Sequence, residues 1–410
     1  MRFARVISLP ARLGACPARE LGRHRPGHSH DDVAHASAPA GLLAVCAVAV
    51  LFVPLGCSGA DEPAGSPPDA DGRLPAHGLQ AWQPYQLRRP DFRLISTSGA
   101  GFYRFSLPTS RRDDREPPSV RISDQLITAA ARERVELLPV LIRSRLRERS
   151  PRKQVAEPPE GPIQHAEWRR RVRFLAERYG PGGSFWRDRP RLPYRPVRSW
   201  EVWNEPNIPP YWDGRRPDPR EYGRLLRETR GVLRAADPHA RIVSGGIASR
   251  HSGARYLGAA LDAAGSCSVD AISVHPYAAT VERAMNYLGQ ARAVADSRGL
   301  RAVELWTTEI GWRVGGGGNS AIEASKVENP AAQASALDGF LAAAARRREE
   351  LGLGPTFAFA LRDRVDPATG NVSDRSGLRL ADDTPRPAWG VLVRRAKAAP
   401  PLPRAKPRRC

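Results

Sequence analysis

Lysine is almost absent from this 410-residue chain, since only four of its 64 basic residues are lysines, namely Lys153, Lys326, Lys397 and Lys406. The arginine-rich remainder, with many alanines, glycines and prolines, is typical of a protein encoded by a high-GC genome. The formal net charge of +21 by itself favours a nucleic-acid-binding protein. Seven of the basic residues lie in 391–410, however, and no recognition motif for nucleic acid accompanies the charge. We therefore expect no nucleic-acid partner.

Cysteine is also scarce, and the five cysteines do not form a disulfide framework. Cys16 and Cys46 lie in or before an apolar stretch near the N-terminus, Cys57 follows that stretch, and Cys410 is the last residue. Only Cys267 falls inside the part expected to fold, where we expect a small buried hydrophobe. No spacing of Cys and His typical of a metal site is present. The sequence therefore predicts neither a metal nor a cofactor.

The N-terminal region lacks an apolar run long enough to span a bilayer comfortably. Residues 41–56 (GLLAVCAVAVLFVPLG) are shorter than the roughly 20 residues of a transmembrane helix, which favours a signal-peptide core. The segment ending in Cys57 resembles a bacterial lipoprotein signal, in which the cysteine is lipidated and anchors the protein to the membrane. A plain signal anchor is the alternative. We expect a leader at 1–57, a Pro-rich tether at 58–75, and an extracellular or envelope-anchored protein.

The remaining chain alternates short β-rich runs with amphipathic helical runs, the pattern of a parallel α/β domain. Eight strand–helix units in about 320 residues predict a single (β/α)8 TIM barrel over 76–397, followed by a basic disordered tail at 398–410. The expected strands are 78–83, 101–107, 135–142, 199–204, 241–247, 271–275, 303–309 and 356–361. The expected helices are 91–98, 123–133, 164–179, 219–236, 255–264, 281–297, 330–351 and 387–397.

Two glutamates stand at the ends of the fourth and seventh predicted strands. Glu205 follows the run Trp200–Asn204, and Glu309 ends the run Val303–Glu309. Side chains at the C-terminal ends of barrel strands converge on one mouth, so these two carboxylates are expected to face each other. Retaining glycoside hydrolysis requires such a pair roughly 5 to 5.5 Å apart. The alternative is that both glutamates are solvated loop residues.

The motifs around these glutamates resemble a known clan of enzymes. Asn204-Glu205-Pro206 and Thr308-Glu309-Ile310-Gly311-Trp312 resemble the two catalytic motifs of retaining glycoside hydrolases with catalytic Glu on strands four and seven. The context of the first motif resembles the bacterial cellulase-like and β-xylosidase-like members, and His275-Pro276-Tyr277 resembles their strand-six element. The resemblance covers about 78–393. It implies a retaining glycoside hydrolase acting on a β-linked oligo- or polysaccharide, which the N-terminal leader would export.

The resemblance also implies roles for individual residues. Glu205 would be the acid/base and Glu309 the nucleophile, while Asn204 would hydrogen-bond the sugar 2-hydroxyl. Arg104 would keep the nucleophile ionised through its positive charge, although a structural ion pair inside the barrel is the alternative. In the strand-six element, Tyr277 would hydrogen-bond to the nucleophile, and His275 would lie beside it at the barrel mouth.

Two features depart from the family pattern or go beyond it. The strand at 356–361 has no Trp to floor the sugar subsite, so we expect other aromatic residues to stack on sugar, among them Trp82 and Trp312. The loop 143–153 carries six basic residues and one acid, which favours an acidic glycan as the substrate. A solvated arginine-rich loop is the alternative.

A catalytically weak carbohydrate-binding barrel at the cell surface is the alternative function for the whole protein.

Overall fold

The computed structural model describes residues 73–408, apart from 83–86, 109–117, 148–149, 250–252, 316–324 and 367. The predicted leader at 1–57 lies outside these residues, as does all of the unit Met1–Ala64. Most of the predicted tether is likewise outside them. Among the described residues, no helix has the length and apolar character needed to cross a membrane.

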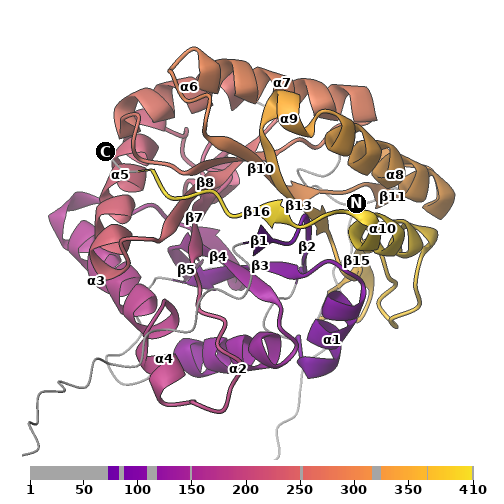
Figure 1. Cartoon of the computed structure of the whole chain (residues 1–410), viewed down its shortest axis with the longest axis horizontal. Coiled ribbons are helices and arrows are strands. Elements are labelled where there is room, and N and C mark those ends of the chain that lie inside the picture. Colours follow the sequence, from indigo (N-terminus) through magenta and orange to yellow (C-terminus); the bar gives the residue numbers. More distant parts are fainter. Residues whose placement is uncertain are drawn as a thin grey trace, which may run out of the picture. The chain divides into compact units, whose positions relative to one another are not determined.

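The domain is built on a closed barrel of eight parallel strands (Figure 1). Each strand pairs with its two neighbours, and the last pairs with the first, as the alternating sequence pattern predicts for a (β/α)8 barrel. The predicted fold is therefore confirmed. In order around the barrel the strands are β2 (His77–Gln80), β3 (Phe102–Pro108), β4 (Glu136–Ile142), β7 (Ser199–Asn204), β8 (Arg241–Ala248), β9 (Ala271–His275), β10 (Glu304–Ile310) and β13 (Leu353–Phe359).

Helices connect the strands and cover the outside of the barrel (Figure 1). The predicted helix at 330–351 is in fact two helices, α8 and α9, which meet at Arg347. The helices are α1 (Arg89–Thr97), α2 (Pro118–Arg132), α3 (Gly161–Tyr179), α4 (Ser184–Arg187), α5 (Pro219–Ala236), α6 (Gly253–Ala264), α7 (Val281–Asp296), α8 (Pro330–Arg346), α9 (Arg348–Leu351) and α10 (Pro387–Ala398).

Helix α5 shows why these segments become helices. The side chain of Asp218 caps its first turn by accepting a hydrogen bond from the Arg220 backbone N–H at 2.9 Å. Pro219 follows at the first helical position, where its missing N–H costs nothing. Apolar residues recur at helical spacing and are buried against the barrel, among them Leu226 and Leu233. The capping residues and the spacing of the apolar residues therefore both favour a helix over this segment.

The interior of the barrel has an apolar lower layer and a polar upper layer. In the lower layer, the ring of Phe102 packs against Trp306 and Phe357 at centroid distances of 5.9 and 5.1 Å. Because side chains alternate along a strand, the next inward position on β3 is Arg104, and the next on β10 is Thr308. Both side chains are buried, so the polar layer lies directly above an apolar floor.

The C-terminal tail is ordered over its described residues 398–408, contrary to the sequence-based expectation. Its strand β16 (Leu402–Pro403) pairs antiparallel with β1 (Arg73–Leu74), and Figure 1 shows the pair crossing one end of the barrel. The side chains of Leu74 and Leu402 are buried against the lower layer. The backbone N–H of Arg408 donates to Asp270 at 2.7 Å. The predicted disorder is wrong because one leucine in a Pro/Arg-rich segment finds apolar surface that only the folded barrel creates.

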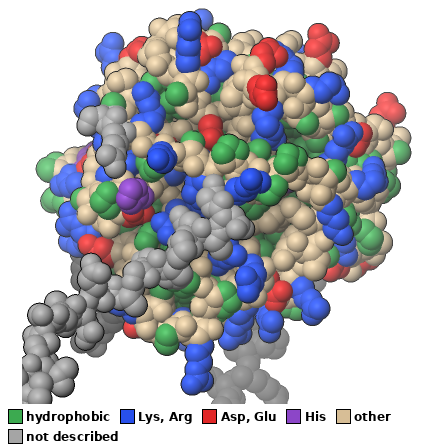
Figure 2. Space-filling view, viewed as in Figure 1, with side chains coloured by type: hydrophobic (Ala, Val, Ile, Leu, Met, Phe, Trp, Pro, Cys, Tyr) green, Lys and Arg blue, Asp and Glu red, His purple; other side chains and the backbone are tan. Residues whose placement is uncertain are grey.

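Two further sequence-based expectations concern cysteine and charge. Cys267, expected to be a small buried hydrophobe, is half-buried and disulfide-bonded, and the other four cysteines lie outside the described residues. Lys and Arg side chains are spread over the face seen in Figure 2, with acidic side chains among them, rather than gathered in one stripe. On this face, the distribution fits an arginine-biased composition better than a surface built to follow a nucleic-acid backbone.

We predict that Leu402→Ala lowers the free energy of unfolding by about 2 kcal/mol, because it opens a cavity under the barrel floor. Urea denaturation followed by far-UV circular dichroism measures the change. The control is Ile163→Ala on α3, since the Ile163 side chain is 75% exposed. A tail that is not packed on the barrel would give equal stabilities for the two variants.

Candidate active site

Irregular backbone at the ends of β7 and β10 turns several polar side chains toward the barrel mouth. Trp203 and Glu205 have φ angles of +78° and +42°, in the left-handed region that non-glycine residues rarely adopt. Asn204 lies between them. On β10 the pairing with β13 shifts register after Thr307, and the consecutive residues Thr308 and Glu309 both reach the same cluster. Regular strands would have sent alternate side chains outward.

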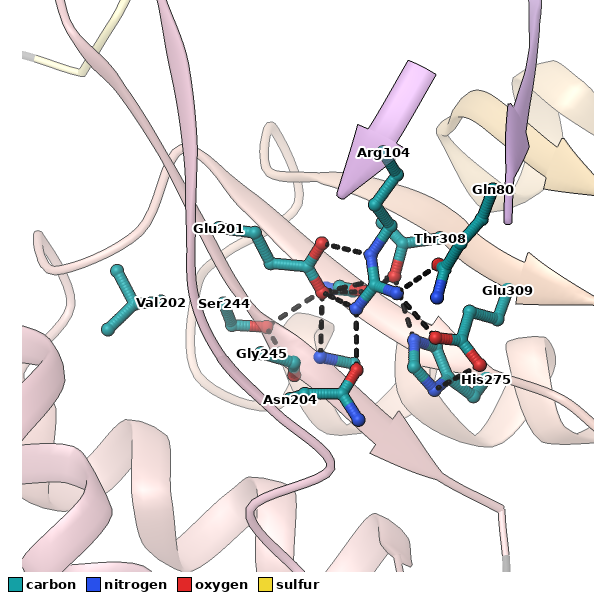
Figure 3. Close-up of polar contacts among 12 residues, drawn as sticks. Gln80, Arg104, Glu201, Val202, Asn204, Ser244, Gly245, His275, Thr308 and Glu309 are labelled. Atoms are coloured by element: carbon teal, nitrogen blue, oxygen red, sulfur yellow. Dashed lines mark hydrogen bonds and ion pairs between the residues drawn. The ribbon is translucent and has the colours of Figure 1, made fainter. Parts of the chain in front are cut away.

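Arg104 lies at the centre of this cluster (Figure 3). Its guanidinium donates to Glu201 twice, from Nε at 2.6 Å and from Nη2 at 2.9 Å. Nη2 also donates to Asn204 Oδ1 at 2.7 Å, and Nη1 donates to Glu309 Oε1 and Gln80 Oε1. Arg104 is 1% exposed, so two buried carboxylates compensate one buried cation.

A second group of contacts joins β9 to the two predicted catalytic glutamates. His275 Nδ1 lies 3.0 Å from Glu205 Oε1 and 3.6 Å from Glu309 Oε2. The Tyr277 hydroxyl donates to Glu309 Oε2 at 2.9 Å. On its other side, His275 Nε2 lies 2.9 Å from Thr308 Oγ1. The structure therefore brings together Glu205, Glu309, His275 and Tyr277 at the barrel mouth.

The surroundings of Glu205 and Glu309 shift the pKa values of the two carboxyls in opposite directions. Burial raises the pKa of Glu205 above its usual value, and this effect outweighs the influence of His275. Burial acts in the same direction on Glu309, but His275, the Arg104 charge and the Tyr277 hydrogen bond together lower the pKa of that carboxyl. Carboxylate oxygens of the two residues lie within 4.8 Å of one another. One carboxyl is thus favoured as the acid and the other as the anion.

Glu205, His275 and Glu309 also offer the closest set of possible metal donors among the described residues. Their donor atoms are already engaged, since Arg104 and Tyr277 donate to Glu309, and His275 contacts Glu205. A divalent cation here would face the Arg104 guanidinium on the same carboxylate. The donor set therefore fits proton transfer better than metal binding.

Trp82 lies next to this site. The half-buried Trp82 ring meets Phe359 edge-on at 4.7 Å, and Phe359 in turn contacts Tyr277 at 6.4 Å. Phe359 ends the eighth barrel strand, where the sequence lacks the expected Trp. The guanidinium of Arg364, from β14 (Arg364–Val365), lies over the Trp82 ring at 5.1 Å. An arginine therefore covers the ring that we expected to stack on sugar.

Trp312 is not positioned to contact a substrate, which corrects the sequence-based prediction. It is 1% exposed, its indole N–H donates to the Ala278 carbonyl at 3.1 Å, and its ring packs on Phe340 of α8. The chain turns away from the mouth after Glu309, so this tryptophan enters the layer between barrel and helices. Tyr211 is closer to the site, because Glu205 and Glu309 add to the effect of burial in raising the pKa of its hydroxyl.

Part of the chain is similar to a known family of proteins. Residues 201–337 match the family described as the glycosyl hydrolase catalytic core. The resemblance to glycoside hydrolases inferred from the sequence is thereby confirmed, and both predicted catalytic glutamates lie inside the matched region. None of the curated proteins matches the chain.

Solved structures of glycoside hydrolases share the fold. A family 39 glycoside hydrolase from Bacteroides cellulosilyticus has a TM-score of 0.56 at 20% identity over 80% of this chain. A glucosidase from Croceicoccus marinus has a TM-score of 0.56 at 15% identity over 79%, and a β-xylosidase from Caulobacter crescentus has 0.51 at 16% over 78%. The chain spans 64%, 68% and 69% of these proteins, respectively.

Sequence reasoning missed three residues of this site. Glu201 is completely buried and pairs with Arg104, while Thr308 and Gln80 complete the polar layer. The signal for Glu201 was present, because a lone carboxylate interrupts the otherwise apolar run before Asn204. A charged residue in a buried strand requires a partner of opposite charge inside the barrel.

The basic loop after β4 forms a hairpin of β5 (Ser144–Arg147) and β6 (Ser150–Ala156). The Ala156 carbonyl accepts from the Asp213 N–H at 2.8 Å, which places the base of the hairpin beside the loop that follows β7. Arg143 pairs with Glu157 at 2.9 Å. The side chains of 144–155 lie outside the described residues, so selection of acidic glycans by this loop stays a prediction.

We predict that Gly246→Ala destabilises the protein by about 1 to 3 kcal/mol, through overpacking at the site. A Cβ at this position would lie 1.9 Å from His275 Nε2. The matched control is Gly231→Ala on α5, where a Cβ meets nothing within 4 Å and alanine favours the helix. Chemical denaturation compares the two, and equal stabilities would contradict the close packing of His275.

Proposed function

We propose that this protein is a retaining glycoside hydrolase in which Glu205 is the acid/base and Glu309 the nucleophile. The observation that carries the proposal is a pair of glutamates with pKa values shifted in opposite directions and oxygens within 4.8 Å. Two carboxyls with separated pKa values suit one acid and one anion. The short separation favours retention, since inversion needs room for a water between the carboxyls.

In the first step, a Glu309 oxygen attacks the anomeric carbon while the bond from that carbon to the leaving oxygen breaks. The leaving oxygen keeps the bonding electron pair and takes the proton from Glu205, and the sugar is left as an ester on Glu309. Arg104 and Tyr277 hold the nucleophile through hydrogen bonds from Nη1 and Oη. Asn204 Oδ1 accepts from Arg104, which directs the amide Nδ2 away to donate to the sugar 2-hydroxyl.

In the second step, Glu205 takes a proton from water, whose oxygen attacks the anomeric carbon and releases Glu309. The Glu309 charge contributes to raising the pKa of Glu205 in the free enzyme. Esterification removes that charge, so the pKa of Glu205 falls in the intermediate. The same residue can therefore serve as acid in the first step and as base in the second.

We expect Glu309→Ala to lower kcat for aryl β-glycosides by roughly 10³-fold or more, because the covalent step is lost. A panel of nitrophenyl glycosides identifies the sugar, and proton NMR of the first-formed product tests whether the anomeric configuration is retained. Azide, which fits the space left by the carboxylate, should restore turnover and give a glycosyl azide of inverted configuration.

The matched control is Glu177→Ala, which removes an exposed carboxylate from the outer helix α3. It should leave kcat unchanged. Full activity in Glu309→Ala would remove the proposed mechanism. Binding of oligosaccharide without turnover by the wild type would instead favour a carbohydrate-binding barrel.

A second, narrower proposal concerns the sugar, and it rests on Arg364. This exposed residue holds its guanidinium over Trp82 and pairs with no carboxylate among the described residues. Its charge also acts on Tyr211, which Glu205 and Glu309 influence too, so it lies within electrostatic reach of the reacting pair. An unpaired guanidinium at a sugar site suits the carboxylate of a hexuronic acid.

We predict that Arg364→Gln lowers kcat/KM for a nitrophenyl β-hexuronide by about 10- to 100-fold, through loss of a charge-assisted hydrogen bond. The value for the matching neutral hexoside should not change. Arg394→Gln, on the outer helix α10, removes the same charge away from the site and serves as the control. Equal effects on both substrates would overturn the preference for acidic sugars while leaving the hydrolase proposal standing.

Export is the part of the proposal that rests on sequence alone. The apolar stretch 41–56 and the following Cys57 support a secreted or lipid-anchored protein. Metabolic labelling with a fatty acid, compared between the wild type and Cys57→Ser, distinguishes the lipid anchor from simple secretion.

A further inference from the structure

Glu201 is a buried carboxylate that the reaction proposed above does not use. It lies on β7, four residues before Glu205, and is completely buried below the mouth. Arg104 donates to both of its oxygens, at 2.6 and 2.9 Å. Both oxygens of a carboxylate paired in this way act as hydrogen-bond acceptors.

Thr308 connects this carboxylate to His275. The Thr308 Oγ1 atom lies 3.1 Å from Glu201 Oε1 and 2.9 Å from His275 Nε2. A hydroxyl has one proton, and the charged carboxylate is a stronger acceptor than a neutral imidazole nitrogen. Thr308 therefore donates to Glu201 and accepts from His275, which requires a proton on Nε2. Ser273 also contacts Thr308 Oγ1, and its hydroxyl lies 3.4 Å from the same carboxylate oxygen.

The proton on Nε2 leaves Nδ1 of a neutral His275 as a hydrogen-bond acceptor. Nδ1 lies 3.0 Å from Glu205 Oε1, so this contact is a hydrogen bond when Glu205 holds the proton. We propose that Glu201, acting through Thr308, is a positioning residue that fixes the tautomer of His275 and thereby retains the proton of Glu205. The proposal rests on the assignment of Glu205 as the acid/base.

Among the described residues, few other charged and titratable groups surround His275. Glu205 and Glu309 face Nδ1 from the ends of β7 and β10, and Glu201 and Arg104 lie behind Thr308. The Tyr277 ring meets the imidazole edge-on at 6.2 Å. Arg104 is shared between two carboxylates, so the cluster carries no excess positive charge that would exclude a protonated Glu205. Gly246 packs against the ring, and its missing Cβ leaves room for this one orientation.

The fixed tautomer also bears on the second step of hydrolysis. Once Glu205 has given its proton to the leaving group, its carboxylate faces the lone pair of Nδ1, which offers it no hydrogen bond. The carboxylate is thus less stabilised than it would be beside an Nδ1–H group, and it is a stronger base toward water. The opposite tautomer would stabilise the carboxylate and lower the pKa of Glu205. Less of the enzyme would then hold the proton needed for the first step, and the carboxylate would be a weaker base in the second.

Thr308→Val tests the connection without removing either buried charge. The valine leaves Nε2–H without an acceptor, so the tautomer with the proton on Nδ1 becomes favourable and donates to the Glu205 carboxylate. The pKa of Glu205 then falls, and the basic limb of the pH profile of kcat/KM should move about one pH unit lower. Thr308→Ser keeps the hydroxyl and should keep the limb at the wild-type pH. A shift of the same size in both variants, or in neither, would overturn the proposal.

A second measurement does not depend on activity. Long-range proton–nitrogen NMR spectra of ¹⁵N-histidine-labelled protein distinguish the two neutral tautomers, and His275→Gln identifies the signals of His275. The wild type near neutral pH should show the Nε2–H tautomer, and Thr308→Val should show Nδ1–H. An imidazolium or Nδ1–H form in the wild type would overturn the proposal. The expected tautomers in a protein without hydrolase activity would support the connection and overturn the proposed function instead.

Discussion

A single buried cation, Arg104, is the constraint on which the upper half of the barrel depends. A guanidinium that is 1% exposed has lost its hydration and must be compensated by partners inside the protein. Its planar group presents five N–H donors in fixed directions, and four side chains from three other strands accept from them. The positions of Asn204 and Glu309 follow from this geometry. The same geometry requires Glu201, because one carboxylate alone would leave Nε without a partner.

The difference between the two glutamates at the mouth also originates at Arg104. Both carboxyls are buried, and burial by itself raises the pKa of each. Only Glu309 receives a hydrogen bond from the guanidinium, whereas Glu205 has His275 as its side-chain partner. Glu309 stands at the end of β10 and Glu205 just after the end of β7. This difference in position is enough to shift the pKa values of the two carboxyls in opposite directions. No residue that is intrinsically unusual is needed for this separation.

Much of this arrangement could be predicted from the sequence because it follows from strand ends. Glu205, Glu309, His275 and Tyr277 stand at the C-terminal ends of apolar runs, and a barrel brings such positions together. The contacts of Glu201 could not be predicted in the same way, since its strand gives no indication of which cation lies opposite.

The errors have a common physical origin in long-range packing. Trp312 ends a predicted catalytic motif, but it is buried because the chain turns outward, and that turn depends on where α8 packs. Residues 402–403 pair with residues more than 300 positions earlier in the chain. Neither contact leaves a local pattern of apolar residues, caps or turns.

Apolar packing in the lower half of the barrel supplies the stability that the strained, polar upper layer requires. Left-handed backbone at Trp203 and Glu205 costs about 1 to 3 kcal/mol per residue and must be offset elsewhere. The offset comes from packed aromatic rings below Arg104, with Leu74 and Leu402 covering the end of the barrel. These side chains also keep water out from below, so the charges act on one another with little screening. In the proposed reaction, water and sugar share one approach, from the mouth, and the side chains that contact the sugar there also determine when water reaches Glu205.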